Sequence, residues 1–155
     1  MGQAAFAHEI EIRTSRAQLH AFLSDLHNYL PLHPLILSIE DLPPDPEMPG
    51  ARRYRVVDRV PFGPFQLRAR YVAAIDPVSD HEIQAHAWQS PGIQLQTTYA
   101  LDESGAKTRL VERVWVEAPR LLRRFVTTQA SRAHQETLTR MKTLFEGSRG
   151  PSESG

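Results

Sequence analysis

The hydrophobic period of the chain changes once, from that of strands to that of a helix, and this change constrains the fold most. Between residues 51 and 117, apolar and polar residues alternate in runs separated by glycine and proline, which is typical of antiparallel strands joined by hairpins. After Pro119, apolar residues recur every three or four positions with no glycine or proline before Gly147. This predicts one amphipathic helix of about 28 residues, roughly 40 Å long. The predicted strands are Arg52–Val60, Phe65–Asp76, His81–Gln89, Ile93–Asp102 and Lys107–Glu117.

The first fifty residues predict one strand followed by short helical segments. Residues 6–13 alternate as a half-buried strand does. Ser15 then has the position of a helix N-cap, with Gln18 completing a capping box. Two prolines interrupt the helical spacing, so residues 26–38 are predicted to form a second short helix or an irregular turn. A short strand over residues 37–42 follows.

Length and composition fit a single domain, predicted over residues 1–146, with a disordered tail over residues 147–155. The chain has 155 residues and no net charge, so nucleic acid is not expected as a partner, because phosphate binding needs a basic surplus. The absence of cysteine excludes disulfides and thiolate chemistry. No segment has the pattern of a signal peptide or a membrane span. A cytoplasmic protein without stable membrane insertion is expected, and an edge strand leaves a homodimer possible.

One face of the predicted sheet combines small residues with tyrosines. Ala69, Ala73, Ala85 and Ala87 fall on the apolar face with Tyr54, Tyr71 and Tyr99, and so do two carboxylates, Asp58 and Glu112. Burying a lone carboxylate costs several kcal/mol unless it is paired or protonated. A cavity between sheet and helix would relieve that cost.

Three other interpretations remain open for this face. The alanines can instead allow the helix to pack closely on the sheet. Asp58 can lie in solvent near a strand end, and Glu112 can face outward across a β-bulge, which reverses the alternation.

Three local phrases carry a resemblance to a known superfamily. RTSRAQLHAFLSDLHNYLPLHP at residues 13–34, ARYVAAIDP at residues 69–77 and AKTRLVERVWVEAP at residues 106–119 resemble its first helices, its strand ending in Asp-Pro and its final strand. Their order resembles the START-related, Bet v 1-like superfamily, also known as SRPBCC or polyketide cyclase/dehydrase proteins. The resemblance covers residues 6–145. It implies an α+β helix-grip fold, in which a curved seven-stranded antiparallel sheet wraps around a long C-terminal helix, with two short helices after strand 1.

The resemblance also implies a deep cavity for a hydrophobic or amphipathic molecule, such as a lipid, isoprenoid or polyketide. The expected ligand-binding residues fall into four groups. Tyr54, Tyr71, Thr97 and Tyr99 are expected on the cavity wall, with Glu112 and Asp58 as its polar anchors. Tyr29 and His33 are expected at the mouth, and Phe125 and Gln129 on the helix.

Catalysis is the alternative to binding. Aromatase/cyclase or dehydratase chemistry needs a positioned acid or base, and a carboxylate in an apolar cavity has a raised pKa that suits it. The same groups can also orient a ligand by hydrogen bonds, and we favour binding, with no catalytic residue assigned and no cofactor. The histidines lack metal-ligand spacing: His20 and His27 are seven residues apart, and His81 and His86 point to opposite strand faces.

The strand arginines allow two interpretations. They form either a patch for an anionic surface or a solvated face partly balanced by Glu82, and we favour the second. These residues are Arg52, Arg53, Arg55, Arg59, Arg68 and Arg70.

Overall fold

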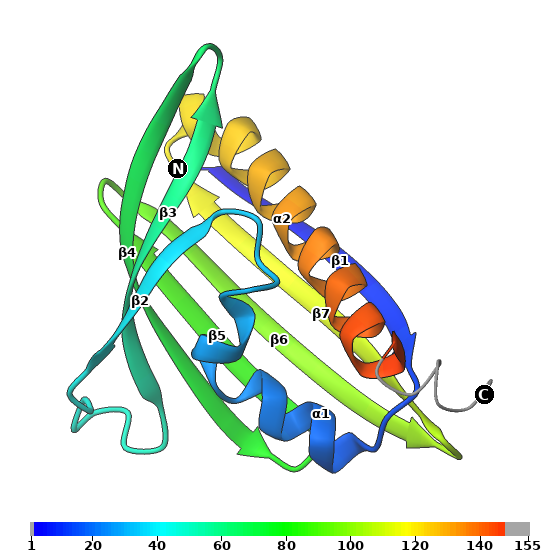
Figure 1. Cartoon of the computed structure of the whole chain (residues 1–155). Helices are drawn as coiled ribbons and strands as arrows, with labels where there is room; N and C mark the ends of the chain where they lie inside the picture. Colours follow the sequence, from blue (N-terminus) through cyan, green and yellow to red (C-terminus); the bar gives the residue numbers. More distant parts are fainter. Residues whose placement is uncertain (1, 148–155) are drawn as a thin grey trace.

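The computed structural model describes residues 2–147 and shows one sheet gripping one long helix (Figure 1). All seven strands are antiparallel to their neighbours, in the order β1-β7-β6-β5-β4-β3-β2. The strands are β1 (Gly2–Ile12), β2 (Ile36–Leu42), β3 (Arg52–Phe62), β4 (Phe65–Ser79), β5 (Glu82–Gln89), β6 (Ile93–Ser104) and β7 (Lys107–Ala118). The helices are α1 (Arg16–Leu23), the 3₁₀ helix η1 (Leu26–Tyr29) and α2 (Arg120–Gly147). This confirms the helix-grip fold.

The long helix α2 crosses the concave face of the curved sheet (Figure 1). Its 28 residues match the length predicted from the sequence. Because neither α2 nor the sheet can bury its apolar side alone, the two elements share a core. The larger apolar cluster joins α1, the sheet and the second half of α2, with Leu19, Leu110 and Met141 among its buried members. Beyond residue 146, the tail predicted over residues 147–155 lies outside the described residues, apart from Gly147.

Local sequence explains the short elements after β1. Ser15 caps α1, and its hydroxyl accepts a hydrogen bond from the Gln18 backbone N–H, which confirms the predicted N-cap. The Gln18 side chain accepts a hydrogen bond from the Thr14 hydroxyl. The second short helix is only the four-residue turn η1, capped by Asp25. Prolines that follow it prevent a longer helix.

Strand β4 is longer than expected. It passes through Pro77 and ends at Ser79, whereas the sequence predicted an end at Asp76. Its register with β5 shifts between Asp76 and Ser79. A proline without an N–H is tolerated at such an irregularity in pairing.

The β3–β4 hairpin extends past the first turn of α2 (Figure 1). Its two-residue turn holds Gly63 at φ +60, a left-handed conformation that glycine adopts without steric cost. Phe62 and Phe65 pair directly across this turn. The concave side of the hairpin tip therefore has only the start of α2 opposite it.

Candidate ligand-binding cavity

A cavity of about 420 Å³ lies between the concave face of the sheet and α2. Alanines from three elements line it, namely Ala73 of β4, Ala85 of β5 and Ala133 of α2. Small side chains at facing positions leave room that larger ones would fill. Most of the remaining lining is apolar, so the few polar groups in it stand out.

A buried ion pair crosses the cavity wall from β7 to α2. Nδ1 of His134 lies 2.8 Å from Oε2 of Glu112, and the two side chains are 18% and 2% exposed. Burial lowers the pKa of His134, but the charge and hydrogen bond of Glu112 outweigh it, and the net effect is a raised pKa. The pair therefore favours an imidazolium next to a carboxylate.

The second oxygen of Glu112 is left without a partner. Oε1 is buried and has no hydrogen-bond partner among the described residues. Tyr99, which pairs with Glu112 across β6 and β7, lies close to this carboxylate, and the charge and hydrogen bonding of Glu112 both add to the effect of burial in raising the pKa of the Tyr99 phenol. A buried carboxylate oxygen with spare acceptor capacity is suited to a donor group on a bound molecule.

His33 is a second, neutral imidazole beside the pair. Its ring centroid lies 6.3 Å from that of His134. Burial, with the nearby charges of His134 and Arg140, lowers the pKa of His33 to about 3. Nδ1 accepts a hydrogen bond from the Leu35 N–H at 3.2 Å, so the proton of the neutral ring is on Nε2.

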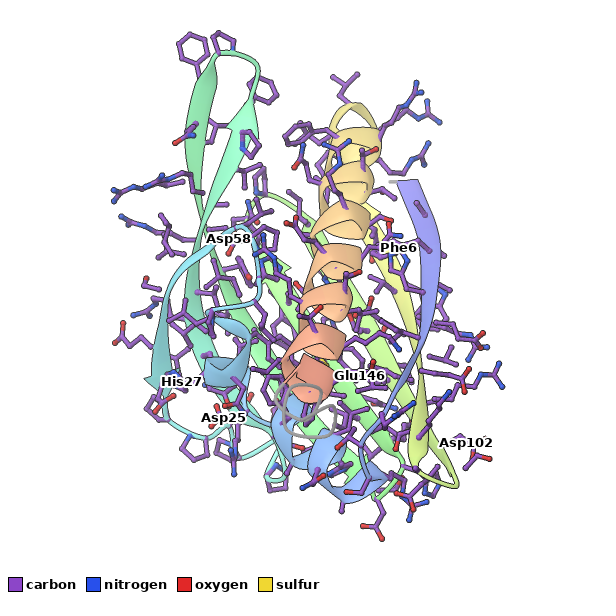
Figure 2. All side chains as sticks on the ribbon, turned by 45° about the vertical axis from the view of Figure 1, so that its right-hand side comes forward. Phe6, Asp25, His27, Asp58, Asp102 and Glu146 are labelled. Atoms are coloured by element: carbon purple, nitrogen blue, oxygen red, sulfur yellow. The ribbon has the colours of Figure 1, made fainter. Side chains whose placement is uncertain are left out.

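Asp58 and Tyr71 form another polar group on the opposite wall. The Tyr71 hydroxyl lies 3.2 Å from Oδ1 of Asp58, a carboxylate that is 8% exposed. Burial raises the pKa of Asp58 to about 6, although Tyr71 and His134 act against that rise. In Figure 2, Asp58 lies on the side of the hairpin that faces α2. Asp58 is thus not in solvent, and Glu112, at 1% exposed, does not point outward.

The structure brings nine of the ten predicted site residues to the cavity lining. The exception is Tyr54, which is buried in the core beside η1, where its hydroxyl lies 3.5 Å from the Leu26 N–H. It follows the same alternation as Asp58, but η1 covers that end of the sheet. The nine residues are Tyr29, His33, Asp58, Tyr71, Thr97, Tyr99, Glu112, Phe125 and Gln129.

Tyr29 does not lie at the cavity mouth. It is 6% exposed, and its hydroxyl donates to the Leu23 carbonyl at 2.9 Å, because η1 turns the ring inward. His33 is half-buried and lies beside His134. Burial raises the pKa values of both Tyr29 and Tyr99, so their phenols stay neutral donors. Both residues line the cavity, Tyr29 from a buried position and His33 from a half-buried one.

The most exposed lining residues mark a mouth of the cavity. Phe62 and Leu67 of the β3–β4 hairpin are 47% and 48% exposed, and Leu122 of α2 is 37% exposed. The rings of Phe62 and Phe125 meet edge to face at 5.3 Å between centroids. The cavity therefore opens between the hairpin tip and the start of α2.

Sequence reasoning missed His134. The residue lies four positions before Leu138 and seven before Met141, on the same side of the helix as these lining residues. A buried Glu112 also needs a cation or donor opposite it. These two signals together could have identified His134.

Two negative findings concern the described residues. Within residues 2–147, no group of three or more histidine, aspartate or glutamate side chains is arranged to hold a metal ion. None of the helices described is both long and apolar enough to cross a membrane.

Comparisons with known proteins support the fold. The sequence matches no model of a known protein family, and no curated protein matches it significantly. Solved structures do match. The Zhui aromatase/cyclase from Streptomyces sp. R1128 superposes with a TM-score of 0.76 at 14% identity, covering 94% of each chain.

Two further structures have the same architecture. A START superfamily protein from Mycobacterium smegmatis gives a TM-score of 0.73 at 15% identity, over 94% of this chain and 99% of that one. Ara h 8.0201 gives a TM-score of 0.61 at 15% identity, over 88% of this chain and 95% of that one. The chain therefore has the START-like, Bet v 1-like fold.

Proposed function

We propose that the protein binds a hydrophobic molecule with a polar group in the cavity between the sheet and α2. The observation that carries this proposal is the buried polar cluster in an otherwise apolar cavity of about 420 Å³. Apolar lining drives the uptake of an apolar body, and a few fixed polar groups orient it. A lipid, an isoprenoid or a polyketide has this chemistry.

The polar cluster indicates where the polar group of the ligand would lie. Glu112 Oε1 is an unpaired acceptor among the described residues. His33 is neutral, and its Nδ1 already accepts a hydrogen bond from the Leu35 N–H, so its Nε2–H is a donor. A hydroxyl on the ligand can donate to the first and accept from the second. This pairing would offset the desolvation cost of the buried Glu112 oxygen.

Filling the cavity should weaken binding. We expect Ala85→Phe to reduce the affinity for a fluorescent fatty acid about tenfold or more, which is ~1.4 kcal/mol, because the ring would occupy space beside Thr97. The measurement is a fluorescence titration, with native mass spectrometry of protein from its own host to detect a co-purifying ligand. Ala7→Phe, exposed on β1, is the matched control. Equal affinities in both variants and the wild type would contradict a cavity site.

A cyclase or dehydratase is the second candidate. Two acid–base groups, the Glu112–His134 pair and Asp58, lie in one cavity, and structures with this fold include an aromatase/cyclase. In an aldol cyclisation, a base removes a proton from a methylene between two carbonyls. The resulting carbanion forms a carbon–carbon bond with a third carbonyl, whose oxygen an acid protonates to a hydroxyl. Dehydration then takes the remaining proton from the attacking carbon, returns a proton to the hydroxyl, and releases water as a carbon–carbon double bond forms.

Turnover distinguishes the two candidates. If the protein is a cyclase, it should convert a poly-β-ketone thioester to an aromatic product, and Glu112→Gln should lower kcat about 100-fold or more, the usual contribution of a general acid or base. Glu136→Gln on the exposed side of α2 is the control. Tight binding of the poly-β-ketone without product would reject the cyclase and leave the binding function.

A further inference from the structure

The cavity mouth is surrounded by exposed apolar side chains. Leu121, in the first turn of α2, is 96% exposed, and Phe65, at the hairpin tip, is 67% exposed. Three further apolar residues are also exposed, namely Phe62 at 47%, Leu67 at 48% and Leu122 at 37%. Figure 1 shows that the hairpin tip and the start of α2 lie at the same end of the molecule. We call these five residues the apolar rim.

The same end of the molecule carries an excess of positive charge, although Glu117 lies at the end of β7 beside it. Residues 59–75 and 118–135 contain seven arginines and no aspartate or glutamate. Six of the seven, namely Arg59, Arg68, Arg70, Arg120, Arg123 and Arg124, belong to the hairpin or the first turns of α2, and no ion pair holds any of them in the described residues. The net charge of zero is balanced elsewhere.

Six of the acidic residues lie at the opposite end. Three acidic pairs lie in or beside the turns between β2 and β3, β4 and β5, and β6 and β7, and these turns lie opposite the hairpin tip (Figure 1). These pairs are Asp45 and Glu47, Asp80 and Glu82, and Asp102 and Glu103. Asp102 points away from the protein at this end in Figure 2. The two ends of the fold therefore differ in charge, with six arginines outside any ion pair near one end and three acidic pairs at the other, where Arg52, Arg53 and Lys107 also lie.

Two of the arginine placements cost folding energy. Arg59 and Arg68 lie directly opposite each other on neighbouring strands, where like charges repel. Arg120, Arg123 and Arg124 lie at the N-terminal end of α2, whose first turn has no acidic residue, although the helix dipole disfavours cations there. Local rules broken without compensation point to a function outside the fold.

We infer that this end of the protein docks on an anionic membrane surface, with the apolar rim entering the interface and the arginines contacting the headgroups. The apolar residues are on two protruding tips and not in a groove, so a planar surface can contact both together. Arginines flanking exposed phenylalanine and leucine are the combination that binds anionic interfaces. Of the strand arginines, Arg52 and Arg55 instead approach Asp25 and Glu40.

Docking at this end would place the cavity mouth against the bilayer. Phe62, Leu67 and Arg68 both line the cavity and belong to this end. An apolar ligand could then enter without crossing water. This consequence rests on the proposed binding function, whereas the docking itself does not.

Vesicle sedimentation with the full chain tests the inference. We expect binding to phosphatidylcholine vesicles with about 30% phosphatidylserine, little binding to phosphatidylcholine alone, and release by added salt. Phe65→Ser with Leu121→Ser should weaken binding about tenfold or more. Arg120→Gln with Arg124→Gln should weaken it about tenfold to 30-fold.

Matched variants at the acidic end serve as controls. Val78→Ser, 47% exposed, and Lys107→Gln should leave vesicle binding unchanged, and every variant should keep the wild-type thermal midpoint because the altered side chains are exposed. Ala85→Phe should also bind vesicles normally, which separates docking from cavity function. No binding to anionic vesicles, equal loss in the controls, binding to an acidic protein alone, or only self-association through the apolar rim would each overturn the inference.

Discussion

Glu112→Ala should destabilise the protein by about 3 kcal/mol or more near pH 6, because it leaves the His134 imidazolium buried without its partner. For a chain of this size, the thermal midpoint should fall by roughly 6 to 12 °C. Chemical unfolding followed by circular dichroism measures the change. The matched control is Glu136→Ala, which breaks the exposed pair with Arg140 on α2 and should cost about 0.5 kcal/mol or less.

The stability lost in Glu112→Ala should decrease as pH rises. The pKa of His134 is raised in the folded state, so the pair contributes its full stability below the unfolded value of about 6.5, and the contribution disappears as pH rises through the folded pKa. Glu112→Ala should therefore cost more near pH 6 than near pH 9. An equal cost at both values would show that His134 is not charged in the pair.

A double substitution separates charge pairing from packing. Replacing a buried ion pair by apolar residues of similar volume is often neutral or stabilising. Glu112→Leu combined with His134→Phe should thus recover most of the stability that Glu112→Ala loses. If the double variant is as unstable as the sum of both single changes, the two residues are not energetically coupled.

The fold could be predicted from the sequence because its elements are regular. The two-residue alternation of the strands correctly assigns Asp58 and Glu112 to the concave face, and the long run without glycine or proline matches the length of α2. The contact partner of Glu112 could not be found the same way. The rotation of α2 about its axis decides whether His134 or a neighbour meets the sheet, and no local pattern sets that angle.

Irregular segments account for the misplaced residues. Tyr29 ends the short turn η1, and residues 30–35 belong to no helix or strand, so alternation says nothing about where Tyr29 and His33 point. Tyr54 shares its alternation with Asp58, and only the position of η1 separates a core residue from a cavity residue. The separation of charge was also hidden, because the net charge of zero sums the two ends of the fold.

Asp58→Asn should stabilise the protein by about 2 to 3 kcal/mol near pH 8, raising the thermal midpoint by roughly 4 to 12 °C. The reason is that burial raises the folded pKa of Asp58 from 3.8 to about 6, so keeping the carboxylate ionised costs folding energy. Asparagine keeps an oxygen that can accept the Tyr71 hydrogen bond but carries no charge. Asp102→Asn, exposed at the end of β6, is the control and should change stability by about 0.5 kcal/mol or less.

The stability gained by Asp58→Asn should increase with pH. Between about pH 4 and pH 6 the folded protein holds the Asp58 proton more tightly than the unfolded chain, so this residue lowers stability as pH rises through that window. The gain from Asp58→Asn should therefore vanish near pH 3.5 and reach its full size above pH 7. A stability gain of the same size near pH 3.5 and above pH 7 would mean that packing, and not charge, causes it.

A residue that costs stability at neutral pH is expected where function requires it. If Asp58 anchors the polar part of a ligand, Asp58→Asn should be more stable than the wild type and yet bind the fluorescent fatty acid or poly-β-ketone more weakly. Titration of both ligands against both proteins at one pH measures this. A variant that gains stability with unchanged affinity for each would assign Asp58 no part in recognition, and would leave the Glu112–His134 pair with His33 as the polar anchor of the cavity.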